Sequence, residues 1–143
     1  MSQQVVARFQ DGRLTKGISM DVDPTRPSFH IRTVQGTTEE IKLSDLKALF
    51  FVRSLEGNAQ RVESRALSPG DSRARASSLI SIKFADGEVM QGLTIRYPPN
   101  RPYFFVVPVD PGSNNIRILV NKSAVKEMTS PSAPAGGAHS PGI

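Results

Sequence analysis

The sequence contains no cysteine and only two histidines, and both shortages limit the chemistry open to the chain. Without thiols it can form neither a disulfide framework nor a thiolate metal site. Histidine is the commonest general base of enzymes, yet His139 belongs to a polar C-terminal stretch and His30 to an expected strand. The sequence has no phosphate-binding loop, nucleophile elbow or metal-spaced set of ligands. We therefore predict a protein with no catalytic residues, no metal site and no cofactor.

Long apolar runs are missing as well. No segment approaches the roughly 18 consecutive apolar residues that a membrane span needs, and the N-terminus lacks the basic and apolar parts of a secretory signal. The fractions of apolar residues (38%) and charged residues (22%) are ordinary for a soluble globular protein. We expect a cytoplasmic protein with no membrane span.

The formal net charge of +5 raises the question of a nucleic acid partner. Basic residues exceed acidic ones by 2 in residues 1–53, by 1 in residues 54–79 and by 2 in residues 80–143. No segment is strongly basic, and a mildly cationic surface is common among soluble proteins. The charge therefore allows a nucleic acid partner without favouring one.

What the sequence does contain is an internal repeat. Residues 5–32 and 80–107 align without a gap and share 8 identities in 28 positions. The shared elements include an Asp-Gly dipeptide, a glycine five positions later and a Pro-x-Arg-Pro segment. A unit of about 50 residues buries only about 60% of the surface that its unfolded chain exposes. We therefore expect the two copies to pack on each other or on a partner.

The first two strands of each copy form a predicted hairpin. Residues 80–84 alternate apolar and polar, which is the period of a half-buried strand. Both Asp-Gly dipeptides suit a tight turn, so residues 14–22 and 89–97 are the expected return strands. Gly17 and Gly92 predict a bend within them. The expected apolar face of the first return strand consists of Leu14, Ile18, Met20 and Val22.

Proline turns then lead to the remaining strands of each copy. These strands are expected at residues 28–33, 40–43 and 49–53, and at residues 103–109, 116–120 and 127–129. A helical turn precedes each last strand, since Ser44 and Ser123 can cap its first backbone groups. The order predicts an all-β fold of two tandem small five-stranded antiparallel barrels, each with one short helical turn before its last strand.

The two barrels are expected in residues 1–53 and 80–129. Residues 54–79 lie between them and contain serines, scattered arginines and a Pro-Gly dipeptide with little hydrophobic periodicity, which predicts a flexible linker. Residues 130–143 are rich in proline, alanine, glycine and serine and cannot build a core, which predicts a disordered tail.

Three segments of the first copy resemble a bacterial domain of unknown function. They read V-V-A-R-F-x-D-G-x-x-x-K-G in residues 5–17, P-x-R-P-x-F-H in residues 24–30 and S-D-L-K-A-L-F-F-V-R in residues 44–53. Members of that group often occur beside signalling modules such as PilZ domains, and the strand order is similar to that of Sm-like barrels. The resemblance implies a small barrel without known catalytic residues. The second copy lacks the Leu-Phe-Phe-Val-Arg strand.

Four arginines are candidates for ligand binding. Arg26 and Arg101 occupy equivalent positions between two prolines, so each either contacts a ligand from a rigid loop or pairs with a neighbouring acid and covers the barrel end. Arg61 and Arg65 have the Arg-x-x-x-Arg spacing with which PilZ domains bind cyclic di-GMP, a ligand that suits the guanidinium group. The Asp-x-Ser-x-x-Gly partner motif of those domains is missing from residues 86–92.

The third strand differs between the copies. In the second copy it is apolar on both faces, because Tyr103, Phe105 and Val107 stand where the first copy is polar. A strand that is apolar on both faces is usually covered on both. We therefore expect these side chains to meet either the first barrel, near Phe50 or Phe51, or another protein.

These features favour a non-enzymatic protein-interaction or regulatory adaptor, with a protein partner or self-association through sheet faces and edges. Two alternatives remain open. One is a PilZ-like module that senses cyclic di-GMP, and the other is an Sm-like RNA-binding protein. RNA recognition relies on bases stacked on exposed aromatic side chains, and aromatic residues make up only 6% of this chain.

Overall fold

The computed structural model describes residues 2–56 and 77–130. Within these ranges the chain forms strands and two single 3-10 turns, and no helix there is long and apolar enough to cross a bilayer. The elements are β1 (Gln3–Phe9), β2 (Leu14–Ser19), β3 (Ser28–Thr33), β4 (Thr38–Lys42), η1 (Leu43–Asp45), β5 (Leu46–Val52), β6 (Ser78–Phe84), β7 (Val89–Thr94), β8 (Tyr103–Val106), β9 (Asn115–Asn121), η2 (Lys122–Ala124) and β10 (Val125–Thr129).

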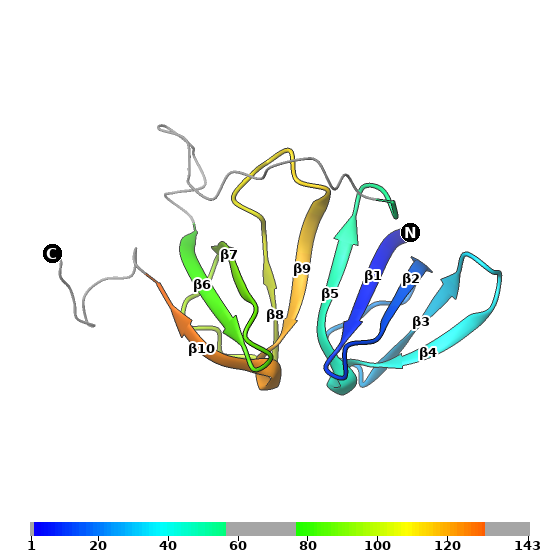
Figure 1. The fold of residues 1–143 in the computed structure, drawn as a ribbon, viewed down its shortest axis with the longest axis horizontal. Helices are drawn as coiled ribbons and strands as arrows, with labels where there is room; N and C mark the ends of the chain where they lie inside the picture. Colours follow the sequence, from blue (N-terminus) through cyan, green and yellow to red (C-terminus); the bar gives the residue numbers. More distant parts are fainter. Residues whose placement is uncertain (1, 57–76, 131–143) are drawn as a thin grey trace, which may run out of the picture.

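Strands of both copies share one antiparallel sheet. Seven strands pair in the order β4-β3-β2-β1-β5-β9-β8, and three pair in the order β10-β6-β7. A two-residue bridge between Leu93 and Val107 links the chain after β8 to β7. The all-β class is confirmed. Two separate closed barrels are not confirmed, because β5 pairs with β1 of its own copy on one side and with β9 of the other copy on the other side (Figure 1).

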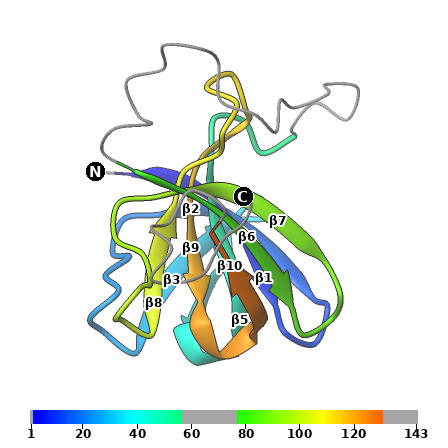
Figure 2. The ribbon, with the colours of Figure 1, turned by 90° about the vertical axis from the view of Figure 1, so that its left-hand side faces the viewer.

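β5 separates two hydrophobic cores, which explains why it joins the copies. All seven of its residues are buried and all except Lys47 are apolar, and such a strand needs cover on both faces. Leu49 and Phe51 face the core of the first copy, whereas Ala48, Phe50 and Val52 face the core of the second. Figure 2 views the molecule from the side of the smaller sheet, with β6, β7 and β10 nearest and the strands of the first copy behind them.

The two copies repeat the same pairing registers. Ser28 pairs with Lys42 between β3 and β4, and Tyr103 pairs with Asn121 between β8 and β9. The ladder between the first and last strand of each copy also shifts at an equivalent position. Equivalent residues are thus 75 positions apart in the first three strands and 79 apart in the last two.

The first return strand buries the face opposite to the predicted one, whereas in the second return strand Leu93, which belongs to the predicted face, is buried beside the inward Gly92. Leu14, Ile18 and Met20 are 49%, 44% and 75% exposed, while Gly17 faces inward. A Cβ atom on Gly17 would lie 2.1 Å from the carbonyl oxygen of Arg32 on β3. Because only glycine fits this approach, it fixes which face turns inward, and alternation places the apolar side chains outside. The return strands also end earlier than expected, and Val22 packs on the first core beyond β2.

The two 3-10 turns lie where helical turns were expected, but the capping prediction was wrong. The residues at the N-caps are Lys42 and Asn121 instead of Ser44 and Ser123. The Asn121 side chain accepts a hydrogen bond from the N–H of Ser123, whereas Lys42 makes no side-chain cap. Each turn therefore begins two residues earlier than the serines suggest.

Other expected boundaries also shift. β8 ends at Val106, three residues before the predicted end, and β6 begins at Ser78, within the segment expected to be a linker. Residues 57–76 of that segment, which include Arg61 and Arg65, lie outside the described residues. Of the expected tail, residues 130–143, all except Ser130 lie outside them as well.

Candidate binding groove

The two proline turns of the repeat line one groove. A cavity of about 440 Å³ lies between residues 24–27, which connect β2 to β3, and residues 101–103, which lead into β8. A second cavity of about 380 Å³ adjoins it and extends along residues 94–96. Pro24, Thr25, Arg101 and Tyr103 line both cavities. Turns that lie 75 residues apart in the sequence thus form the walls of a single site.

Each proline turn is fixed by the 3-10 turn of its own copy. The N–H of Leu43 donates to the carbonyl oxygen of Pro27 at 3.0 Å, and the N–H of Lys122 donates to that of Pro102 at 2.8 Å. The Lys122 ammonium group also donates to the carbonyl oxygen of Pro99 at 3.0 Å. Walls held in this way lose little conformational freedom when a ligand binds.

Arg26 has a carboxylate neighbour, as expected from the interpretation that it pairs with a nearby acid. Its Nε lies 3.6 Å from the Oδ2 of Asp23, although the Arg26 side chain stays 73% exposed. Asp23 also accepts hydrogen bonds from the hydroxyl group of Thr25 at 2.6 Å and from its N–H at 2.9 Å. These bonds, followed by the nearby Arg26 charge, lower the pKa of Asp23. The Asp23 carboxylate therefore shapes the turn and neutralises part of the Arg26 charge.

Arg101 and Arg96 have no carboxylate partner among the residues that the structure describes. Sequence reasoning missed Arg96, because its equivalent in the first copy is Asp21 and no repeated pattern marks it. Ile95, next to it, is 86% exposed and lines the second cavity. The groove thus offers unpaired guanidinium groups, which bind carboxylates and phosphates bidentately, beside an exposed apolar side chain.

The predicted apolar patch does not form one surface. Tyr103 and Phe105 pack on the first core, and the Phe105 ring centroid lies 6.1 Å from that of Phe51. Phe50 points to the opposite face of β5 and joins the second core, since consecutive strand residues face opposite sides. Val107 lies at the bridge to β7 and is 38% exposed.

Arg117 of β9 covers this aromatic pair from within the chain. Its guanidinium carbon lies 4.4 Å from the ring centroids of both Phe51 and Phe105. A guanidinium group over an aromatic face is attracted by the ring quadrupole. Phe51 and Phe105, which the sequence predicted to meet the other copy or a partner protein, therefore already contact each other and Arg117 within the chain.

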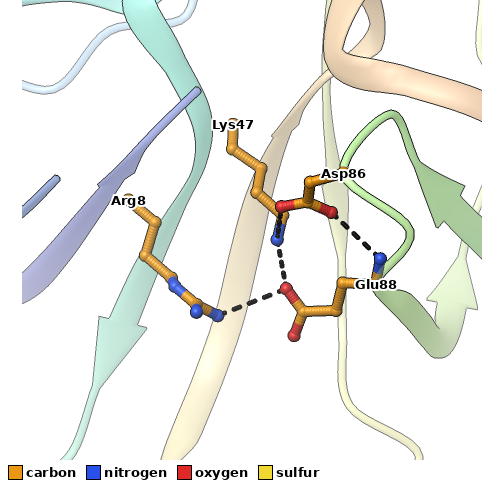
Figure 3. Close-up of polar contacts among 4 residues, drawn as sticks. All are labelled: Arg8, Lys47, Asp86 and Glu88. Carbon is orange, nitrogen blue, oxygen red and sulfur yellow. Dashed lines mark hydrogen bonds and ion pairs between the residues drawn. The ribbon is translucent and has the colours of Figure 1, made fainter. Parts of the chain in front are cut away.

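A cluster of charged groups joins the copies near the hairpin between β6 and β7 (Figure 3). The Lys47 Nζ lies 2.8 Å from Asp86 Oδ2 and also contacts Glu88, which lies 3.5 Å from an Arg8 nitrogen. The Lys47 side chain is only 8% exposed, and its Nζ lies 4.8 Å from the ring centroid of Phe84. Since the acids and bases in this cluster pair with one another, it holds the copies together and leaves no free group for a ligand.

His30 lies on β3 and pairs with Asp21. Its Nδ1 is 2.7 Å from Oδ2 of Asp21, and this hydrogen bond raises the pKa of His30. Within residues 2–56 and 77–130, no three side chains of His, Cys, Asp or Glu gather in a way that could hold a metal ion.

Comparison with known proteins identifies a family. No curated protein and no solved structure is significantly similar to the chain. One family model matches residues 1–130 and so spans both copies; the likeness to Sm-like barrels and the neighbouring PilZ modules stay predictions. The chain belongs to the family of unknown function DUF6982.

Proposed function

We propose that the chain is a non-enzymatic interaction module that binds an extended acidic segment of a partner protein in the groove between its proline turns. The observation that supports this most is the meeting of Arg26 and Arg101 in one groove. These are the two repeated residues that the needs of the fold do not explain. The turns that carry them are fixed by backbone hydrogen bonds, so the groove is suited to a ligand.

The lining of the groove indicates the chemistry of the ligand. Arg96 and Arg101 lack carboxylate partners in the described part of the chain, so a carboxylate of the ligand can take that place. Ile95 offers an apolar contact directly beside them. The two adjoining cavities suit successive side chains of an extended segment that carries both acidic and apolar residues.

The aromatic residues favour a protein ligand over RNA. The chain has seven Phe and two Tyr, all of them within the described residues, and each is buried or half-buried. Single-stranded RNA is bound largely by bases stacked on accessible aromatic rings, whereas Tyr103, Phe104 and Phe105, which line the groove, are packed on the two cores. The PilZ-like alternative depends on Arg61 and Arg65, which lie outside the described residues.

Fluorescence anisotropy with labelled peptides tests the proposal. The probes are an extended peptide of alternating Glu and Leu, its counterpart with Gln in place of Glu, a uridine oligonucleotide of equal charge and cyclic di-GMP. We expect the full chain to bind the Glu peptide best. The double change Arg96→Ala and Arg101→Ala should weaken this binding by about tenfold or more, which corresponds to about 1.4 kcal/mol.

The matched control is Arg32→Ala, which removes an exposed arginine on β3 outside the groove and should leave the affinity within about twofold, as expected for a distant charge in physiological salt. An equal loss of peptide affinity in Arg32→Ala would mean that only the net charge of the chain matters, which would contradict the proposal. Stronger binding of the oligonucleotide or of cyclic di-GMP, abolished by the same double change, would instead assign the groove to a nucleotide.

A further inference from the structure

The pairing of β5 with β9 joins the copies head to tail. The last strand of the first copy meets the fourth strand of the second, so the two halves contribute different surfaces. The equivalents of these strands are β10 and β4, and both lie at sheet ends where no described strand covers their outer edge. A heterologous contact of this kind can be repeated from one molecule to the next.

We propose that the edges of β10 and β4 form a second, charge-blocked version of the β5–β9 interface, whose partner is another copy of this chain. If the two edges carried opposite charges, chains could add head to tail through them. The like charges that they carry instead keep the chains apart. The argument compares each residue of the paired interface with its equivalent at the free edges.

The strand residues change from apolar to charged. In the paired interface Ala48 lies opposite Val120, and Phe50 lies opposite Ile118. The equivalents of Ala48 and Phe50 on β10 are Glu127 and Thr129, and those of Val120 and Ile118 on β4 are Ile41 and Glu39. The same register would make Glu127 and Glu39 diagonal neighbours on one face, where like charges are unfavourable. Both carboxylates are exposed in the chain.

Charged residues also replace apolar or uncharged ones on the opposite face of β4 and at its end. Leu119, which pairs with Leu49, has Glu40 as its equivalent on β4. Continuing the register would also bring Lys126 opposite Lys42. Charged residues on an exposed edge strand are a common means of preventing edge-to-edge pairing.

The ion pair at the hairpin is also replaced, by two like charges at the free edges. Arg8 contacts Glu88 across the paired interface, and their equivalents are Lys83 and Arg13, two cations. Arg13 already pairs with Asp11 in its own hairpin at 2.7 Å. Of the two acids that anchor Lys47, Glu88 is thus replaced by a cation, and Asp86 is replaced by Asp11, which already pairs with Arg13 instead of being free for Lys126.

Two complementary variants test the proposal. The first restores the β4 side with Arg13→Glu, Glu39→Ile and Glu40→Leu, and the second restores the β10 side with Glu127→Ala and Thr129→Phe. Each change installs the residue found at the equivalent position of the β5–β9 interface. We expect the labelled first variant to bind the second variant at least about tenfold more tightly than the labelled wild-type chain binds the wild-type chain.

Each variant mixed with wild-type chain is the control for general stickiness, and circular dichroism checks that both variants are folded. No binding between the two folded variants would overturn the proposal. Equally tight binding between wild-type chains would overturn it too, because the charges would then block nothing. Binding of the first variant to wild type that matches its binding to the second variant would show that the β10 charges have no effect, with the same consequence. Should a variant fail to fold, Glu127→Gln with Glu39→Gln gives the same comparison, because neutralising both carboxylates removes the repulsion without adding apolar surface.

Discussion

Lys47 on β5 of the first copy donates to Asp86 in the hairpin of the second copy, with 2.8 Å between Nζ and Oδ2. The lysine is buried, whereas the Asp86 side chain is 52% exposed. A buried ammonium group without a partner would be costly, so this contact ties the position of the hairpin to that of β5. The copies are thus joined by a specific ion pair as well as by the shared strands.

Removing the Lys47 charge should destabilise the folded chain more than removing the nearby surface charge. We expect Lys47→Met to lower the free energy of unfolding by about 2 kcal/mol, since hydrogen bonds to charged groups contribute that much when one partner is buried. Arg8→Met should cost less than about 0.5 kcal/mol, because its contact to Glu88 is 3.5 Å long and exposed. Urea denaturation followed by circular dichroism measures both changes. Equal losses in the two variants would contradict the role given to Lys47.

The inward glycines of the return strands lead to a second prediction. A Cβ on Gly17 would meet the backbone oxygen of Arg32 at 2.1 Å, and a Cβ on Gly92 would lie 2.3 Å from a Val106 methyl carbon. Gly17→Ala should therefore destabilise the chain by about 3 kcal/mol, because backbone must move. A Cβ on Gly92 would also lie 2.9 Å from the carbonyl oxygen of Val107, so backbone must move there too, but by less than at Gly17, and we expect Gly92→Ala to cost less.

Gly36→Ala is the matched control for these changes. Gly36 has a φ of +90° and nothing within 4 Å of an added Cβ, so only the left-handed backbone conformation opposes alanine. We expect a loss of about 1–2 kcal/mol in the free energy of unfolding. A smaller loss for Gly17→Ala than for Gly36→Ala would show that β2 and β3 can separate without cost.

The local features of the chain could be predicted from the sequence, because each depends on a few neighbouring residues. The Asp-Gly hairpins, the proline turns and the turn before each last strand are of this kind. The repeat also singled out Arg26 and Arg101 as the residues left over by the needs of the fold. Periodicity misjudged β2, because the close approach to β3 is a tertiary constraint that local alternation does not contain.

The joining of the copies could not be predicted in the same way. The sequence indicated that the third strand of the second copy is covered on both faces, and Phe105 does contact Phe51. It did not indicate that β5 pairs with β9, because an apolar strand predicts that a neighbour covers it but does not specify which strand that neighbour is. Arg96 escaped notice for a related reason: its place in the groove depends on how the turns meet.

The ion pair between His30 and Asp21 makes stability depend on pH. The hydrogen bond from Asp21 raises the pKa of His30 above its ordinary value of 6.5, so the stabilisation that it provides is fully present below pH 6.5 and is lost as the pH rises through the folded pKa. Burial acts to raise the pKa of Asp21, but hydrogen bonds from His30 and Ser19 outweigh it and lower that pKa below 3.8. This second contribution is present above pH 3.8 and is lost as the pH falls through the folded value.

The pair therefore stabilises the chain most between pH 3.8 and pH 6.5, and the His30 contribution is lost between pH 6.5 and its raised pKa. An NMR titration of the imidazole protons measures that pKa directly. Asp21→Asn should return the pKa of His30 toward 6.5, since the amide cannot stabilise the imidazolium charge. The decrease in the free energy of unfolding that the wild-type chain shows as the pH rises above 6.5 should then disappear. Asp23→Asn, which changes a carboxylate two residues away that does not contact His30, should leave the His30 titration unchanged. An unchanged titration in Asp21→Asn would mean that the proton on His30 is not held by this carboxylate, and the pH dependence would then have to arise elsewhere.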